Sequence, residues 1–209
     1  MTGDVAIVNI FRHHAWVTSG GTYHHGDLRA ALLEAALEVL AERGLAGLSL
    51  RECARRADVS HAAPYRHFAD KDALVAAIAE LGFARLARAG IAAMEGAVGP
   101  RDRLDAYGVA YVRFAVDHPE LFRVMFTCEV DPSTSGPDGA RAFDLLLECA
   151  TALSGAEDPM TSAIAAWSLP HGVAMLLLDQ RIPKERATTP EAAESLCREI
   201  FARWRGVLG

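Results

Sequence analysis

The sequence predicts an all-α protein with about nine helices. Alanine and leucine dominate the composition, and β-branched residues are sparse after the first twenty positions. Apolar residues recur at helical spacing in many segments, and Ser, Asp and Pro stand where such segments begin. No strand pattern of any length follows residue 20. With 209 residues and 51% hydrophobic content, the chain can bury one or two cores.

The chain divides into three parts by composition. Residues 1–21 lack helix signals and end in Gly20-Gly21, so we expect a flexible leader, with Val17 as an alternative start. Residues 22–75 hold three helix patterns close together. Residues 76–209 hold longer helix patterns and form the second predicted domain.

The first helix follows Asp27, which can cap it. Gly44 ends it, at a position that favours a left-handed backbone. Its apolar face at helical spacing consists of Leu28, Leu32, Ala35, Ala36, Val39 and Leu40.

The next two predicted helices are short. Ser49 and Glu52 form an S-x-x-E capping box for a helix that ends near Ala57. A turn at residues 58–60 follows, and Ser60 caps a helix through about His67. Two short helices joined by a tight turn are the layout of a helix-turn-helix, whose last helix can enter a DNA major groove.

The remaining helices are longer. Asp70 caps the fourth, and the Asp158-Pro159 and Thr189-Pro190 pairs open the eighth and ninth. The predicted ranges are 101–116 for the fifth, from 118 for the sixth, 140–153 for the seventh, 159–181 for the eighth and 190–207 for the ninth.

The composition also excludes several classes of protein. No apolar run approaches the roughly 20 residues that span a bilayer, and residues 1–17 have the wrong charge order for a secretory signal. We therefore expect a cytoplasmic protein with no membrane partner. No catalytic signature, cofactor motif or metal-ligand spacing is present, so we expect neither an enzyme, a cofactor nor a metal site. We expect free, buried thiols at Cys53, Cys128, Cys149 and Cys197.

Positive charge is concentrated in one segment although the net charge is −6. Residues 51–71 contain five Arg or Lys against three Asp or Glu, and two histidines in addition. Arg55 and Arg56 could equally form a solvated face. Phe68 and Leu74 are expected in the core, and Pro64 is expected to stiffen its helix. The local excess of positive charge is what a DNA-binding surface needs.

The segment from Leu28 to Val75 resembles the DNA-binding domain of the TetR family of bacterial transcriptional regulators. The resemblance is carried by the Ala-rich first helix ending in Arg43-Gly44, by LSLRE at 48–52, and by PYRHF at 64–68 followed by DKD at 70–72. YVRFAVDHPELFRVMF at 111–126 and WSLPHG at 167–172 resemble one type of C-terminal domain in that family. The turn departs from the family pattern, because Asp58 stands where Gly is usual; Asp tolerates the positive φ that this position commonly needs.

The resemblance implies binding to double-stranded operator DNA. Small or polar side chains at the start of the third helix can approach base edges, whereas aromatic and basic ones suit phosphates. Tyr23, His24 and His25 could form an arm toward the groove. The predicted DNA-binding residues are Arg51, Ser60, His61, Ala62, Ala63, Tyr65, Arg66, His67 and Lys71.

Aromatic and Met residues on the middle helices could line a cavity for a small-molecule effector, or could simply fill a core. His171 follows Pro170, so it could bond a carbonyl freed by the kink or could hold a ligand. The predicted ligand-binding residues are Tyr111, Phe114, Phe122, Met125, Phe126, Trp167, His171 and Met175.

The last helix carries a long apolar stripe. The resemblance implies that the eighth and ninth helices pair with their copies in a homodimer, which would read a palindrome. The predicted interface residues are Ala193, Leu196, Cys197, Ile200, Phe201 and Trp204. We expect a repressor released from its operator by a small apolar or aromatic ligand. Two alternatives remain: a helical enzyme or carrier that binds a small molecule without DNA, and a helical protein-interaction adaptor.

Overall fold

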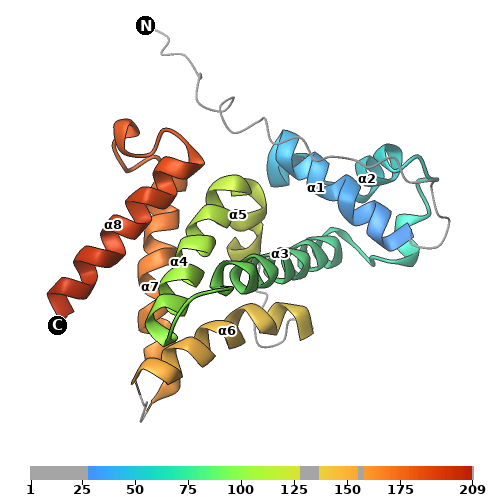
Figure 1. The fold of residues 1–209 in the computed structure, drawn as a ribbon. Helices are drawn as coiled ribbons and strands as arrows, with labels where there is room; N and C mark the ends of the chain where they lie inside the picture. The colour runs from blue at the N-terminus through green and yellow to red at the C-terminus, as the bar shows by residue number, and fades with distance from the viewer. Residues whose placement is uncertain (1–27, 128–136, 155–157, 209) are drawn as a thin grey trace, which may run out of the picture.

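The computed structural model describes residues 28–127, 137–154 and 158–208. These residues form eight α-helices and two short 3-10 helices and contain no strand, which confirms the all-α prediction. The predicted leader, the arm at residues 23–25, Asp27 and Cys128 lie outside the described residues. Figure 1 shows α1 and α2 at one end of the molecule and α6, α7 and α8 at the other, with the long helix α3 leading from one to the other.

The N-terminal helices are α1 (Leu28–Gly47) and α2 (Leu50–Arg56). Gly44 has a φ of +62°, so α1 kinks at the glycine predicted to end it. The Ser49 hydroxyl accepts a hydrogen bond from the Glu52 backbone N–H at 3.2 Å, which confirms the cap of α2. Asp58 has a φ of +53°, so it takes the left-handed turn position.

The third helix differs from its prediction. Instead of an α-helix from Ser60 to His67, the chain forms successive three-residue turns that include the 3-10 helix η1 (Pro64–Arg66). The Ala63 N–H donates to the Ser60 carbonyl at 2.9 Å. Pro64 has no N–H with which to continue an α-helical ladder from that carbonyl, which favours the tighter turns.

Helix α3 (Lys71–Met94) connects the N-terminal helices to the rest of the fold. Asp70 caps it by accepting a hydrogen bond from the Ala73 N–H at 2.8 Å, as predicted. The helix continues without a break through residues 75 and 76, where the sequence predicts the boundary between the two domains. One continuous helix therefore joins the N-terminal helices to the C-terminal bundle (Figure 1).

The C-terminal bundle is built around α4 (Pro100–Asp117), which contacts α3, α5, α6, α7 and α8. Asp158 caps α7 through the Met160 and Thr161 backbone N–H groups, as predicted. Three cysteines among the described residues, Cys53, Cys149 and Cys197, are free and buried. The other elements are α5 (Pro119–Thr127), α6 (Pro137–Ser154), α7 (Pro159–Leu178), the 3-10 helix η2 (Lys184–Arg186) and α8 (Pro190–Leu208).

Helix α7 corrects the expectation that no segment is apolar enough to span a bilayer. Among the described residues it is the one helix that qualifies by length and composition, with 20 residues and a mean hydropathy of 1.4. Only 22% of its most apolar window is buried within the protomer. The helix therefore presents much apolar surface that the protomer itself does not cover.

Candidate nucleic-acid interface and ligand site

The segment between α2 and α3 presents most of the predicted DNA-binding residues to solvent. His61, Arg66 and His67 are exposed, and Tyr65 is 53% exposed although it is large and aromatic. Pro64 and Phe68 are buried beneath them, which confirms that both are structural. Ser60, Ala62, Arg51 and Lys71 are also exposed, whereas Ala63 is half-buried. A surface of this kind can contact both base edges and phosphates.

Two of the five Arg and Lys side chains in residues 51–71 form ion pairs with carboxylates of the same protomer. Arg55 donates twice to the Glu52 carboxylate, at 2.9 and 2.7 Å. This pairing lowers the pKa of Glu52 to about 2. Arg56 donates to Glu42 at 2.9 and 2.6 Å and reaches Glu38 at 3.4 Å, so it binds α2 to α1. Arg55 and Arg56 therefore contribute little free positive charge for DNA.

Lys71 has a partner of its own. Its amine donates to the Leu45 carbonyl at 3.0 Å, near the end of α1. The α3 N-terminus is also occupied in part, because Asp70 accepts one of its backbone N–H groups. An ammonium group has three donors, so Lys71 can keep this bond and still contact a phosphate.

Five of the eight predicted ligand-binding residues come together in one cluster from α4, α5 and α7. Ring centroids lie 5.3 Å apart for Tyr111 and Phe122, and 4.9 Å for Phe122 and Phe126. His171 lies 4.9 Å from Phe126 and 5.2 Å from Trp167. Tyr111 and Phe122 are buried, whereas the other three are partly exposed.

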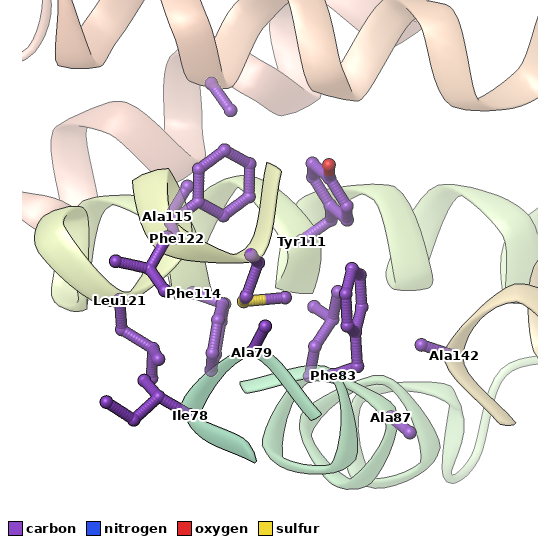
Figure 2. Close-up of a cluster of buried hydrophobic side chains, with 14 of the residues drawn as sticks. Ile78, Ala79, Phe83, Ala87, Tyr111, Phe114, Ala115, Leu121, Phe122 and Ala142 are labelled. Atoms are coloured by element: carbon purple, nitrogen blue, oxygen red, sulfur yellow. The ribbon is translucent and has the colours of Figure 1, made fainter. Parts of the chain in front are cut away.

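Hydrogen bonds link the three polar members of this cluster. The Trp167 indole N–H donates to the Tyr111 hydroxyl at 3.0 Å, and that hydroxyl lies 2.7 Å from His171 Nδ1. Figure 2 shows the Tyr111 hydroxyl pointing away from α3. His171 thus bonds a side chain on α4. Burial lowers the pKa of His171 and raises that of Tyr111, so both are neutral near pH 7.

The other three predicted ligand-binding residues are not part of this aromatic cluster. Phe114 is buried with its ring 4.9 Å from the His118 ring. Met125 is buried against Gly82 of α3, where an added Cβ would lie 2.6 Å from the Met125 sulfur. Met175 is partly exposed and packs against the core. Phe83 of α3 is not among the predicted ligand-binding residues, although its ring lies 5.6 Å from that of Phe126. Its position on the apolar face of α3 is the feature of the sequence that could have indicated it.

A separate cavity of about 280 Å³ lies between the start of α4 and α6. Its residues include none of the predicted ligand-binding residues: it is lined by Gly99, Pro100, Arg103, Glu148, Cys149 and Ala152.

The predicted dimer residues on α8 divide into two sets. Phe201 is 7% exposed and packs against Gly108 of α4, and Cys197 is fully buried. Ala193 and Leu196 are buried as well. These four residues are therefore buried within the protomer. The apolar stripe of α8 binds α4, and Ile200 and Trp204 remain accessible, Trp204 being 50% exposed.

Helix α7 carries three further exposed apolar side chains. Met160, Ile164 and Leu176 are each 49% exposed, although all three are large and apolar. Met160 and Ile164 are four residues apart and lie next to each other on the helix, whereas Leu176 lies near its C-terminal end. The same helix also holds Trp167 and His171 in the aromatic cluster.

Two family models match the chain in separate segments. Residues 32–78 match the model described as bacterial regulatory proteins, tetR family, and residues 104–201 match the tetracyclin repressor-like C-terminal domain. Together these segments span more than half of the chain.

Curated relatives resemble mainly the N-terminal helices. An HTH-type transcriptional repressor of Mycobacterium tuberculosis is 46% identical over 52 residues, which is 25% of this chain and 28% of the relative. The HTH-type transcriptional regulator BetI of Rhizobium meliloti is 36% identical over 78 residues, or 37% of this chain and 38% of the relative. This chain therefore matches well under half the length of these relatives.

A solved structure resembles nearly the whole chain. A protein of unknown function from Rhodococcus sp. RHA1 is 35% identical, with a TM-score of 0.70 over 88% of this chain and 97% of that one. Taken with the two family models and the geometry above, these matches show that the chain is a member of the tetR family of bacterial regulatory proteins.

Proposed function

We propose that this protein is a cytoplasmic transcriptional regulator that binds a palindromic operator as a homodimer and is released by a small apolar or aromatic ligand. The observation that carries the proposal is the exposed segment Ser60–His67. It sets Tyr65, Arg66 and two histidines on the surface of a helix-turn-helix. Membership of the family supports a regulator over an enzyme or an adaptor.

Within the DNA-binding surface, we assign the residues two roles. Lys71, Arg51 and Tyr65 hold phosphates, because all three are exposed and each can donate a hydrogen bond to a phosphate oxygen. His61 and Arg66 read base edges, and Ala62 is small enough to approach a thymine methyl group. The second protomer places a second copy of this surface on the operator, so the operator is a palindrome.

The dimer rests on the exposed apolar side chains of α7, together with Ile200 and Trp204 of α8. The three large apolar side chains on α7 would otherwise remain in water. The same helix carries Trp167 and His171 in the aromatic cluster. A ligand at the cluster therefore contacts the helix that also carries the proposed dimer surface.

Release by a ligand requires a link from the aromatic cluster to the DNA-binding helices. Helix α5 carries Phe122 and Phe126 in the cluster and seats Met125 on Gly82 of α3. Arg85 of α3 pairs with Glu34 of α1 at 2.8 Å. A ligand that displaces α5 thus moves α3 and α1 together. It releases DNA only if it binds the two arrangements with affinities that differ by about 1–3 kcal/mol or more.

The test is a gel-shift assay with purified protein on DNA from the region upstream of its own gene. We expect a retarded complex that resists unrelated competitor DNA and whose affinity falls steeply with salt. A helical carrier or an adaptor would show no preference for that DNA over the competitor. Such a result would overturn the proposal.

A further inference from the structure

Hydrogen bonds join the side chains of Trp167, Tyr111 and His171 in a chain. This chain contains more N–H and O–H donors than acceptors to which they can donate within it. The indole of Trp167 is only a donor, and it donates to the Tyr111 oxygen at 3.0 Å. Tyr111 has one proton to donate, and His171 Nδ1 lies 2.7 Å from its oxygen. A neutral imidazole has one N–H and one acceptor nitrogen.

The environment of Tyr111 decides which nitrogen of His171 carries the proton. Tyr111 is only 5% exposed, and among the described residues His171 Nδ1 is the one acceptor within reach of its hydroxyl. A proton on Nδ1 would leave the buried hydroxyl with no acceptor, which is costly. Nδ1 therefore accepts from Tyr111, and the His171 proton is on Nε2.

The Nε2–H group is then an unused donor. No described residue accepts a hydrogen bond from it, and His171 is partly exposed. The rings of Phe126 and Trp167 both lie next to this imidazole, at 4.9 and 5.2 Å, and 5.9 Å from each other, and both are partly exposed. A flat molecule that reached these rings would meet the Nε2–H donor beside two aromatic surfaces.

The described side chains that contact His171 carry no charge. The rings in contact with His171 are those of Tyr111, Phe122, Phe126 and Trp167, none of which is ionised near pH 7. Burial lowers the pKa of His171, and no charged group among the described residues contributes to this shift. A carboxylate ligand would be desolvated here without a cation to pair with, and an ammonium ligand without an anion.

We propose that this site takes an uncharged aromatic molecule with one hydrogen-bond acceptor, such as a carbonyl oxygen, which binds His171 Nε2–H. The proposal rests on the proposed function, because it names the chemical class of the effector that this function requires. Trp167 and Phe126 supply the apolar contacts, and Tyr111 is a positioning residue that fixes the tautomer of His171.

The test uses three phenyl probes on the full-length protein, with binding measured by calorimetry. Acetophenone carries a neutral acceptor, ethylbenzene has the same shape without one, and benzoate carries a charge. We expect acetophenone to bind about five- to tenfold more tightly than ethylbenzene, as one neutral hydrogen bond predicts. Benzoate should bind no more tightly than ethylbenzene. His171→Phe, which keeps a ring and removes the donor, should make acetophenone and ethylbenzene equal.

Nitrogen-15 NMR of the wild-type imidazoles provides a test that needs no variant. His171 should show the Nε2–H tautomer. The Nδ1–H tautomer, equal binding of acetophenone and ethylbenzene, tighter binding of benzoate, or no binding of any probe at millimolar concentration would each overturn the proposal. Gel shifts on the same wild-type samples keep the two proposals apart, because operator binding does not depend on which probe the site prefers.

Discussion

The Lys71 amine donates to the Leu45 carbonyl at 3.0 Å and so ties the start of α3 to the end of α1. Lys71 therefore has a structural contact in addition to the phosphate contact that we propose. Lys71→Gln removes the charge and keeps a donor, whereas Lys71→Met removes both. We expect both variants to reduce the slope of log affinity against log salt by about one unit for each bound protomer.

The two Lys71 variants should differ in stability. Lys71→Met should melt at a lower temperature than Lys71→Gln, because only the amide can still reach the Leu45 carbonyl. Neither should alter which operator sequence is preferred, as measured on a panel of single-base variants. A changed preference would mean that Lys71 reads bases and that its role is misassigned.

Two arginines of α2 should behave differently toward DNA. Arg51 is exposed and has no ion pair with another described residue, whereas Arg56 is held by Glu38 and Glu42 of α1. Arg51→Met should reduce the salt slope by about one unit per protomer. Arg56→Met should lower the melting temperature and change the slope much less. Equal slopes for the two variants would show that the Arg56 ion pairs open on DNA.

The parts of this fold that the sequence predicts well are those determined by neighbouring residues. The caps at Ser49, Asp70 and Asp158 involve a side chain and an N–H two or three residues away. The left-handed turn at Asp58 is equally local. Such features need no knowledge of the tertiary structure.

The parts that sequence reasoning missed depend on contacts between distant helices. The apolar stripe of α8 predicts that another helix covers it, but not whether that helix belongs to the same protomer or to a second one. In the structure, Phe201 of this stripe packs on Gly108 of α4 in the same protomer. The Arg56 and Glu42 pair joins residues 14 positions apart, so counting charges along the sequence overestimated the free positive charge. Phe83 enters the ligand cluster only because α3 packs beside α5.

The contact between α4 and α8 can be tested with a single methyl group. A Cβ added at Gly108 would lie 2.6 Å from the Phe201 ring, and that ring is too buried to move freely. Gly108→Ala should therefore lower the free energy of unfolding by about 1–3 kcal/mol. Gly172→Ala is the matched control, since nothing lies within 4 Å of its added Cβ. The control should be neutral or stabilising by up to about 1 kcal/mol in urea unfolding at fixed protein concentration.

Acidification should destabilise the protein through two histidines. Burial lowers the pKa of His118 and of His171 below the ordinary value of 6.5. The unfolded chain therefore takes up protons first as the pH falls, so this stability is present above about pH 6.5 and is lost as the pH falls through the lower folded-state values. His118 faces Asp117 and Arg85, whose opposing effects are smaller than that of burial.

Urea unfolding at a series of pH values between 7.5 and 5 measures this effect. The free energy of unfolding should fall less steeply on acidification in His171→Gln and in His118→Gln than in the wild type. If both variants keep the wild-type slope, neither histidine is held neutral by the fold.

The exposed apolar side chains of α7 should hold the dimer together. Ile164 and Leu176 are each 49% exposed, so glutamate at both positions should place charge in the interface without entering the core of the protomer. We expect the double variant Ile164→Glu and Leu176→Glu to sediment as a monomer that keeps its helical circular dichroism spectrum.

Thr151→Glu on the exposed side of α6 is the control and should remain dimeric. Phe201→Glu should instead unfold the protomer, because Phe201 is packed on α4. The monomer should also bind operator DNA more weakly, since one protomer contacts only one half-site. A dimer of unchanged strength in the double variant would exclude these side chains of α7 and leave the accessible residues of α8 as the interface.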